Sequence, residues 1–186
     1  MINEEKDEME FTTQKSETVY VGKAFDVRRD QLLLPDGKTT WFDIVIHPGA
    51  VTMIPIDSQG RILFVRQYRH AVGKELIELP AGTLNPGEDP ETCALREVRE
   101  ETGMSASQLE KIGEFYLVPG YSTEYMYLYL ASNLSVDPLP GDEDEFITVE
   151  AIPLDDVTEM VNKGVIQDAK SLAALLLAEP FLKKYR

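Results

Sequence analysis

One helix, expected over residues 90–102, stands between stretches whose composition is typical of β-strands. Asp89 can accept hydrogen bonds from N–H groups of the first turn, and Pro90 suits that turn because it has no N–H to leave unpaired. The acid Glu91 is favoured by the positive end of the helix dipole, and Gly103 can end the helix. Because the start and stop signals agree, the sequence predicts a helix from Pro90 to residue 102.

The segments around this helix carry short apolar and β-branched runs separated by turns, which predict strands. Strand-like runs begin near Val19 and reach about Ile46, and a hairpin follows in which "AVTMIPI" and "RILFVRQY" flank "DSQG". Further strands are expected in "ELIELPAG", "KIGEFYLVP", "EYMYLYLA" and "FITVEAIPL", and helices near 154–162 and 169–179. Strands and helices mix without a regular alternation, so the predicted fold is α/β (α+β), an α/β/α sandwich around a mixed sheet.

The chain has 186 residues, which fits one domain of ordinary size with an extension. Residues 1–16 are polar without an apolar period and predict a flexible N-terminal arm. Residues 17–47 predict a small β-extension. The main domain is expected over residues 48–186.

Charge and composition narrow the possible partners. The chain has 33 acidic and 18 basic residues and a formal charge of −15, which argues against nucleic-acid binding and favours a cation as partner. Its start, "MINEEKDEME", has no apolar stretch, and no run of 18 apolar residues occurs, so we expect neither a signal peptide nor a membrane span. The single cysteine, Cys93, cannot form a disulfide within its own chain. These features predict a cytoplasmic protein.

The stretch "REVREETG", residues 96–103, concentrates carboxylates on one side of the expected helix. Glu97, Glu100 and Glu101 lie at positions i, i+3 and i+4, so they share one face and repel one another. Carboxylates placed in this way suit Mg²⁺ or Mn²⁺, which prefer hard oxygen ligands. The alternative is a solvated face with ion pairs to Arg96 and Arg99.

The spacing around this stretch decides between the two. Gly82 is followed after five residues by Glu88, and after seven more by "REVREETGM". The segment "GTLNPGEDPETCALREVREETGM", residues 82–104, therefore resembles the sequence box of the Nudix hydrolases at every fixed position. The resemblance implies an α/β/α sandwich, a loop–helix–loop that holds divalent metals, and hydrolysis of a nucleoside diphosphate linked to another group.

Carried over residue by residue, the resemblance implies roles for the box. Glu97 and Glu101 are expected to be direct metal ligands, Glu100 a further or water-mediated ligand, and the backbone carbonyl of Ala81 an additional one. Arg96 is expected to orient the glutamates by ion pairing. Glu88 is expected to anchor the loop to the helix, and Gly82 and Gly103 to allow tight backbone turns.

Features outside the box resemble the ADP-ribose pyrophosphatase group. Pro119 lies sixteen residues after Gly103, within "VPGYSTE", and "RQYR" precedes "ELPAG". The resemblance implies hydrolysis of ADP-ribose to AMP and ribose 5-phosphate, and a homodimer in which the β-extension is exchanged between subunits. Two alternatives remain: hydrolysis of another nucleoside diphosphate sugar such as a GDP-hexose, and a noncatalytic nucleotide sensor. Sensors of this fold often lose box glutamates, and this chain keeps all of them.

Substrate contacts are expected from five residues, which are Arg69, Glu78, Pro119, Glu124 and Trp41. Arg69 would hold the diphosphate or terminal ribose, against the alternative of a surface arginine. Glu78 and Glu124 would contact metal or ribose, against the alternative of solvated carboxylates. Trp41 would stack on adenine, against the alternative of a core position.

A general base is expected outside the box, because metal-bound glutamates are poor proton acceptors. The resemblance points to the acidic loop "GDEDEF", residues 141–146, and there to Glu143 first and Glu145 second. The predicted catalytic residues are Glu143, Glu145, Arg96 and Glu100.

Overall fold

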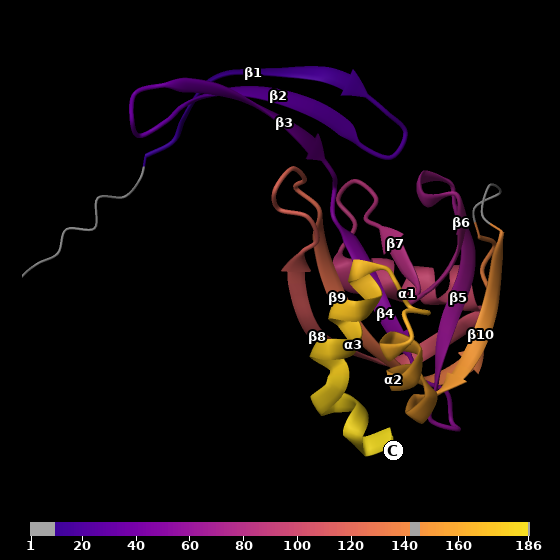
Figure 1. Ribbon diagram of the computed structural model, residues 1–186. Helices are drawn as coiled ribbons and strands as arrows, with labels where there is room; N and C mark the ends of the chain where they lie inside the picture. Colours follow the sequence, from indigo (N-terminus) through magenta and orange to yellow (C-terminus); the bar gives the residue numbers. More distant parts are fainter. Residues whose placement is uncertain (1–9, 142–145, 186) are drawn as a thin grey trace, which may run out of the picture. The chain divides into compact units, whose positions relative to one another are not determined.

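The computed structural model describes residues 10–141 and 146–185 (Figure 1). The chain divides into two compact units, which are described separately. The extension unit consists of Met1–His47 and Val118–Glu124, and the core unit of Pro48–Leu117 and Tyr125–Arg186. No helix in the described part of the chain is long and apolar enough to cross a membrane.

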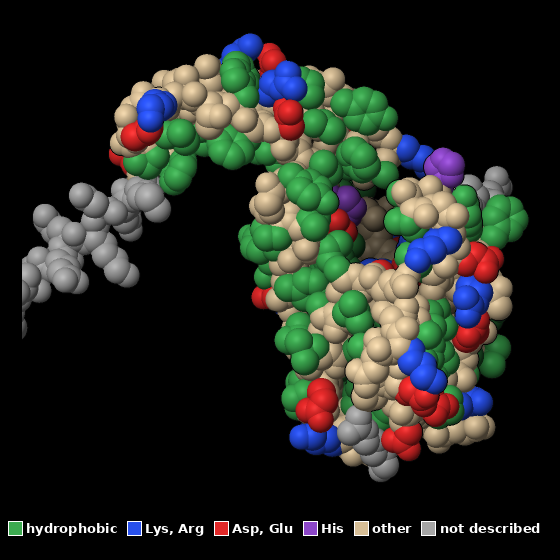
Figure 2. Space-filling model, viewed as in Figure 1, with side chains coloured by type: hydrophobic (Ala, Val, Ile, Leu, Met, Phe, Trp, Pro, Cys, Tyr) green, Lys and Arg blue, Asp and Glu red, His purple; other side chains and the backbone are tan. Residues whose placement is uncertain are grey.

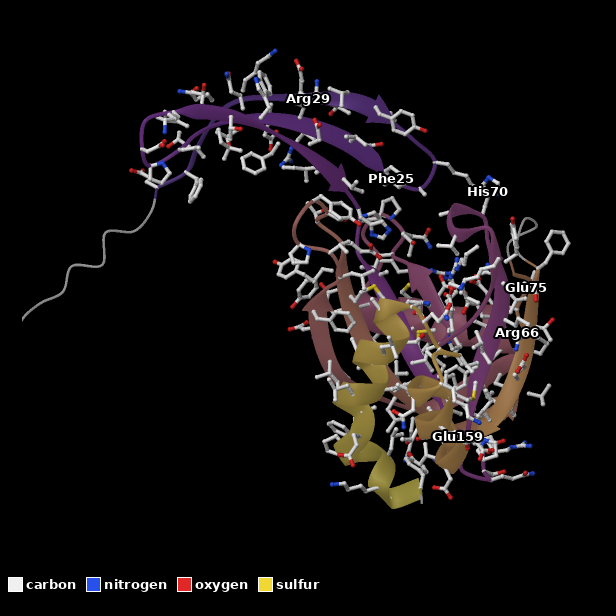
Figure 3. The ribbon with its side chains drawn as sticks, in the orientation of Figure 1. Phe25, Arg29, Arg66, His70, Glu75 and Glu159 are labelled. Carbon is white, nitrogen blue, oxygen red and sulfur yellow. The ribbon has the colours of Figure 1, made fainter. Side chains whose placement is uncertain are left out.

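The extension unit is built on an antiparallel sheet of three strands in chain order. These are β1 (Thr12–Val21), β2 (Asp26–Leu33) and β3 (Thr39–Ile46). Arg29 of β2, labelled in Figure 3, pairs with Asp43 of β3 at 2.7 Å. The segment 118–124 joins this unit through the N–H of Val45, which donates to the carbonyl of Tyr121 at 2.8 Å.

The first strand begins earlier than predicted. β1 starts at Thr12, opposite Leu33, so residues 12–16 form strand where a flexible arm was expected. The hydroxyl of Ser16 donates to buried Asp30 at 2.6 Å. Backbone pairing and this polar contact hold a segment that has no apolar period, which is why composition alone did not reveal it.

The core unit contains two sheets. The strands of the mixed four-stranded sheet lie in the order β7-β4-β9-β8, with β4 and β9 parallel and the other neighbours antiparallel. The antiparallel three-stranded sheet has the order β10-β5-β6. The bounds are β4 (Ala50–Pro55), β5 (Arg61–Arg69), β6 (Lys74–Glu78), β7 (Ala81–Thr83), β8 (Met104–Tyr116), β9 (Tyr125–Val136) and β10 (Ile147–Pro153).

Two strand predictions are wrong in their pairing. The expected hairpin of residues 50–68 does not form, because β4 and β5 belong to different sheets. Beside the turn, Ile56, which follows β4, makes an isolated bridge with Ile62. The expected single strand in residues 75–82 is divided at Leu79 and Pro80, so that β6 pairs with β5 and β7 with β4. Pro80 has no N–H to donate to a ladder, which suits a point where the chain passes from one sheet to the other.

The predicted helices are confirmed. They are α1 (Pro90–Thr102), α2 (Leu154–Asn162) and α3 (Ala169–Leu182). The last one continues past Pro180, where the expected helix stopped, because Ala174, Ala178 and Leu182 bury one side of it. A short 3₁₀ turn, His70–Val72, joins β5 to β6, and Figure 3 shows His70 there.

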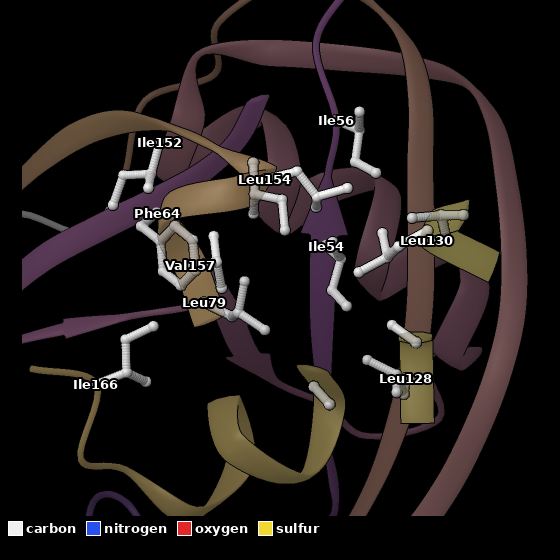
Figure 4. Packing of buried hydrophobic residues seen from close by; sticks show 14 of the residues in the cluster. Ile54, Ile56, Phe64, Leu79, Leu128, Leu130, Ile152, Leu154, Val157 and Ile166 are labelled. Carbon is white, nitrogen blue, oxygen red and sulfur yellow. The ribbon is translucent and has the colours of Figure 1, made fainter. Parts of the chain in front are cut away.

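Helices cover both faces of the four-stranded sheet. On one face, Cys93, Ala94 and Val98 of α1 pack against Val51 and Met53 of β4. On the other face, a larger cluster joins the two sheets to α2 and α3, and Figure 4 shows Ile54 and Leu128 in it with Phe64 of the second sheet. The predicted α/β/α sandwich around a mixed sheet is therefore confirmed.

Candidate active site

Helix α1 is fixed at both ends by the residues that the sequence indicated. The Asp89 carboxylate accepts hydrogen bonds from the N–H groups of Glu91 at 3.0 Å and Thr92 at 3.2 Å. Gly103 has a φ of 72°, a left-handed conformation that favours glycine, and its N–H donates to the carbonyl of Arg99 at 3.1 Å. The apolar side of the helix is buried against β4 and β9. This packing fixes which face of the helix carries the glutamates.

The packing of α1 brings two box glutamates against β7. Glu97 and Glu101 are 9% and 7% exposed, which is unusual for carboxylates and requires partners. The N–H of Ala81 donates to Oε2 of Glu101 at 2.9 Å. The backbone of β7 therefore meets the charged edge of the helix.

Gly82 makes room for the second of these carboxylates. A Cβ atom placed on Gly82 would lie 1.8 Å from the carboxyl carbon of Glu97, far inside van der Waals contact. Gly82 pairs with Val51 in the β4–β7 ladder, so its backbone has little freedom to move away. The absent side chain creates a notch, and the Glu97 carboxylate occupies it.

Arg96 connects the carboxylates of the box. Its Nη1 atom lies 2.6 Å from Oε1 of Glu97 and 2.7 Å from Oε2 of Glu100. Its Nε and Nη2 atoms form a two-point pair with Glu88 at 2.9 and 3.0 Å. One guanidinium thus offsets the repulsion among three acids, and the pairing raises the pKa of Arg96.

Glu88 ties the loop before α1 to the helix. Besides its pair with Arg96, it accepts a hydrogen bond from the N–H of Asn85 at 2.9 Å. The Arg96 hydrogen bonds, followed by that of Asn85, lower the pKa of Glu88 to about 2 despite the opposing effect of burial. The carboxylate is ionised across the neutral range, which keeps the loop attached.

The donor set suits a hard divalent cation. Glu97, Glu100 and Glu101 supply carboxylate oxygens, which Mg²⁺ and Mn²⁺ prefer. The Gly82 notch presents one of these carboxylates at the surface of β7. Within residues 10–141 and 146–185, no three His, Cys, Asp or Glu side chains are grouped closely enough to hold a metal ion as they stand. In this arrangement Arg96 and the Ala81 N–H form hydrogen bonds with the carboxylates. Some of the carboxylates would have to turn away from these donors to bind a cation.

A second charged pair lies beside the box. Nη2 of Arg69 is 2.8 Å from Oε2 of Glu78, and Nε lies 3.1 and 3.3 Å from the two carboxylate oxygens. Glu78 is 2% exposed. Burial alone would raise its pKa, but the Arg69 hydrogen bonds and the charge of Lys170 outweigh this effect and hold the pKa below its usual value. Two residues, Leu79 and Pro80, separate Glu78 from Ala81, so the Cα atoms of Glu78 and Ala81 are at most about 11 Å apart.

The remaining predicted residues are placed as follows. Trp41, Pro119 and Glu124 belong to the extension unit. Trp41 is 46% exposed, with the ammonium of Lys15 over its ring at 5.5 Å, so it is not a core residue. The N–H of Glu124 donates to the Ser122 hydroxyl at 3.1 Å. Their roles stay predictions.

Glu143 and Glu145 lie outside the described residues. The loop that leads to them is attached to the end of α1 by contacts that sequence reasoning missed. The Arg99 guanidinium pairs with the Asp137 carboxylate at 3.0 Å, and the N–H of Asp137 donates to the carbonyl of Gly103 at 3.0 Å. At Gly141, a Cβ would stand 3.7 Å from the carbonyl oxygen of Glu100. The described part of the loop therefore runs beside the box.

With this geometry established, the chain can be compared with known proteins. The model of the NUDIX domain matches residues 46–175, most of the core unit. The chain belongs to the Nudix family. The resemblance recognised in residues 82–104 is thereby confirmed.

This Nudix chain has relatives along nearly its whole length. It is 39% identical over 169 residues to "ADP-ribose pyrophosphatase" of Bacillus subtilis (strain 168), covering 90% of this chain and 91% of that protein. It is 38% identical over 165 residues to "Methanol dehydrogenase activator" of Bacillus methanolicus, covering 88% and 89% of the two. A solved structure described as "Crystal structure of ADP compounds hydrolase" superposes with a TM-score of 0.85 at 25% identity, covering 94% and 95% of the two chains.

Proposed function

We propose that this Nudix protein hydrolyses ADP-ribose to AMP and ribose 5-phosphate with the help of a divalent cation. The observation that carries the proposal is the complete box of acids at β7, where Glu97 occupies the Gly82 notch and Glu101 meets the Ala81 N–H. The relative in Bacillus subtilis bears the name of this activity, and the solved structure that superposes on the chain is described as a hydrolase of ADP compounds.

The reaction adds water across the diphosphate bridge. The oxygen of water forms a new bond to one phosphorus, and the bond from that phosphorus to the bridging oxygen breaks. The bridging oxygen leaves on the other phosphate, and the protons of the attacking water pass to a base or to solvent. A catalyst must therefore orient the diphosphate, offset its negative charge and accept a proton.

The cation would be held by Glu97, Glu100, Glu101 and the carbonyl of Ala81, and we propose Mg²⁺ or Mn²⁺. Nudix enzymes generally depend on a divalent metal. When bound, such an ion offsets charge on the diphosphate and makes the attacking water more acidic. Arg96 keeps Glu97 and Glu100 close together by placing one positive charge between them, which lowers the electrostatic cost of the acidic cluster.

Arg69 is proposed to bind the diphosphate. Its guanidinium matches phosphate oxygens in two-point hydrogen bonds, and Glu78 holds it in one orientation through a two-point pair of its own. A guanidinium fixed before binding loses less entropy when the substrate arrives.

Glu143 is proposed as the general base, with Glu145 as the second candidate. Two observations on neighbouring residues support a base in this loop. Arg99 and Gly103 attach Asp137 to the end of α1, and Gly141 lies beside the backbone of Glu100. Because each residue of an extended chain can span about 3.3–3.6 Å, we propose that a carboxylate two to four residues beyond Gly141 reaches the attacking water.

The extension unit is proposed to form a homodimer with a second copy of the chain. Among its described residues 10–47, Asp30 alone is buried, so the sheet has no apolar core of its own. Large apolar side chains are exposed on this unit, as Figure 2 shows. They include Tyr20, Phe25, Trp41 and Phe42, which are 43–56% exposed. A three-stranded sheet with such surfaces needs further packing to be stable.

The mass of the purified protein in solution, measured by light scattering, tests the dimer. Deleting residues 1–47 should expose surface that the dimer covers and reduce activity at the same time. A soluble and fully active monomer without these residues would exclude the dimer as a requirement.

A cytoplasmic location is also proposed. Cys93 is a buried thiol, and burial raises its pKa to about 12, so it remains protonated at neutral pH. A free thiol of this kind is compatible with a reducing compartment.

The substrate is tested with a panel of ADP-ribose, GDP-mannose, UDP-glucose, NADH and diadenosine polyphosphates, each with Mg²⁺ and with EDTA. We expect the highest kcat/KM for ADP-ribose, with AMP and ribose 5-phosphate as products. Hydrolysis in H₂¹⁸O would show by mass spectrometry which phosphorus is attacked. Preference for GDP-mannose would replace the substrate but retain the reaction, whereas nucleotide binding without turnover would indicate a sensor.

A further inference from the structure

We propose that Lys170, together with Asp168, is a positioning residue for the Arg69–Glu78 pair. This inference rests on the proposed function, because that function assigns Arg69 to the diphosphate. It adds a residue of α3, far from the box in sequence, to the substrate site of the core unit.

The contacts form a continuous chain of charges. Lys170 Nζ contacts Oε2 of Glu78, the same oxygen that receives Nη2 of Arg69. Lys170 Nζ also lies 2.9 Å from Oδ1 of Asp168. The side chains of Lys170 and Asp168 are 12% and 13% exposed, so solvent screens these contacts far less than it screens surface ion pairs.

The start of α3 is locked to the end of β6. The Asp168 carboxylate caps the helix by accepting a hydrogen bond from the N–H of Ser171 at 2.9 Å. The Ser171 hydroxyl in turn accepts a hydrogen bond from the N–H of Leu79, next to Glu78, at 2.8 Å. Lys170 therefore approaches Glu78 from a helix whose position is set by neighbouring hydrogen bonds.

The charges of the four residues balance. Two cations, Arg69 and Lys170, face two acids, Glu78 and Asp168. Oδ2 of Asp168 is buried and has no hydrogen-bond partner among the described residues. Lys170 is the cation that contacts this carboxylate, through Oδ1. Without Lys170 the cluster would carry one excess negative charge beside the place proposed for an anionic diphosphate.

Lys170 also limits the motion of Glu78. The Glu78 carboxylate receives Arg69 from β5 and Lys170 from α3, so it is held from two directions. With only Arg69 present, the carboxylate and the guanidinium could rotate together. The two-point orientation of Arg69 that phosphate recognition requires would then be lost.

Kinetics of three variants test this role. Lys170→Met keeps the aliphatic stem and removes the charge, and Lys170→Arg keeps the charge. Lys163→Met is the matched control, because Lys163 is a solvent-exposed lysine at the end of α2 that pairs with Glu159. We expect Lys170→Met to raise KM for ADP-ribose roughly tenfold and to leave kcat within about twofold. Lys170→Arg should recover most of the loss, and Lys163→Met should match the unmodified protein.

A second readout does not require turnover. The Nε–H of Arg69, which donates to buried Glu78, should give a slowly exchanging signal in ¹H–¹⁵N NMR spectra, assigned by its absence in Arg69→Lys. Lys170→Met should lose this signal through faster exchange with water, and Lys170→Arg should retain it. Circular dichroism establishes that each variant is folded.

The outcomes separate this inference from the proposed function. If the unmodified protein hydrolyses no diphosphate of the panel, the proposed function fails, and the Arg69 signal still decides whether Lys170 orders the pair. The inference would be overturned if Lys170→Met left both the KM for ADP-ribose and the Arg69 Nε–H signal unchanged. It would also be overturned if this variant lowered kcat alone. If Lys170→Met does not fold, Asp168→Asn takes its place, since asparagine can still cap α3 but cannot pair with Lys170. An unaltered KM and Arg69 signal in that variant would equally overturn it.

Discussion

Replacing Gly82 by alanine should strongly reduce catalysis while leaving the protein folded. The added Cβ would lie 1.8 Å from the carboxyl carbon of Glu97, whereas ordinary contact begins at 3.4 Å. The carboxylate must therefore move by at least 3.4 − 1.8 = 1.6 Å. A displacement of about 1 Å in a catalytic group can lower the rate roughly 10²-fold. We expect kcat/KM to fall by about 10² or more, which corresponds to about 2.7 kcal/mol of transition-state stabilisation.

The fold should tolerate this change, because the three nearest atoms, Cγ, Cδ and Oε1 of Glu97, all belong to one flexible side chain and none is a backbone atom. Restricting the unfolded chain stabilises a glycine-to-alanine variant by about 0.4–1 kcal/mol where the backbone permits it. If the displaced Glu97 carboxylate turns toward solvent, it is not left buried without a partner, and Arg96 keeps Glu88 and Glu100, so the lost contact costs on the order of 1 kcal/mol. These effects nearly cancel, so the free energy of unfolding should change by less than about 1 kcal/mol.

The assay compares Gly82→Ala with Gly113→Ala. At Gly113, which lies in β8, an added Cβ would also press on the end of a side chain, Leu177 Cδ1 at 3.1 Å, but that side chain has no place in the proposed site. Activity, Mn²⁺ affinity by calorimetry and urea unfolding are measured for both. Gly82→Ala with near-normal activity and metal affinity would refute the notch argument. Loss of the fold in Gly82→Ala would refute the claim that only the Glu97 side chain moves.

The metal, the general base and the buried Glu78 carboxylate can each be perturbed separately. EDTA should abolish hydrolysis, Mg²⁺ or Mn²⁺ should restore it, and Glu101→Gln should weaken Mn²⁺ binding in calorimetry; full turnover in metal-free buffer would contradict this. Glu143→Gln should lower kcat by roughly 10²–10⁴ with little change in KM, whereas Glu145→Gln should stay near normal; the reverse result would move the base by two residues, and two active variants would place it elsewhere. The pKa of Glu78 is lowered in the folded protein, so its contribution to stability is present above the pKa of the unfolded chain and is lost as the pH falls through the lower, folded value. Urea unfolding at pH 7 and at about pH 3–4 should therefore show a smaller loss of stability for Glu78→Gln than for the unmodified protein, and equal losses would exclude this linkage.

Local signals in the sequence were sufficient to predict the bounds of helix α1 and to identify the residues of the box. The cap at Asp89 and the left-handed Gly103 involve only neighbours within one turn, so the bounds of α1 followed from residues 89–103 alone. The common face of Glu97, Glu100 and Glu101 follows from the helical period alone. Family membership followed from the spacing of the same short segment.

Strand pairing could not be obtained in this way. A turn as tight as "DSQG" normally predicts a hairpin, yet β4 and β5 enter different sheets. Each of them has one partner, β9 for β4 and β10 for β5, that lies more than sixty residues further along the chain. Apolar alternation shows which residues face a core, but it carries no information about which distant strand supplies the neighbouring ladder.

The sequence by itself determined the helix, the acidic box and the chemistry that such a box supports, because these depend on residues a few positions apart. Only the tertiary structure decided what surrounds them. It placed the Glu97 carboxylate where Gly82 has no side chain, and it brought Lys170 to Glu78 across 92 residues of chain. Such contacts arise when separate elements pack on a shared core, and a charge that is paired in this way has the same sequence signature as one that faces solvent.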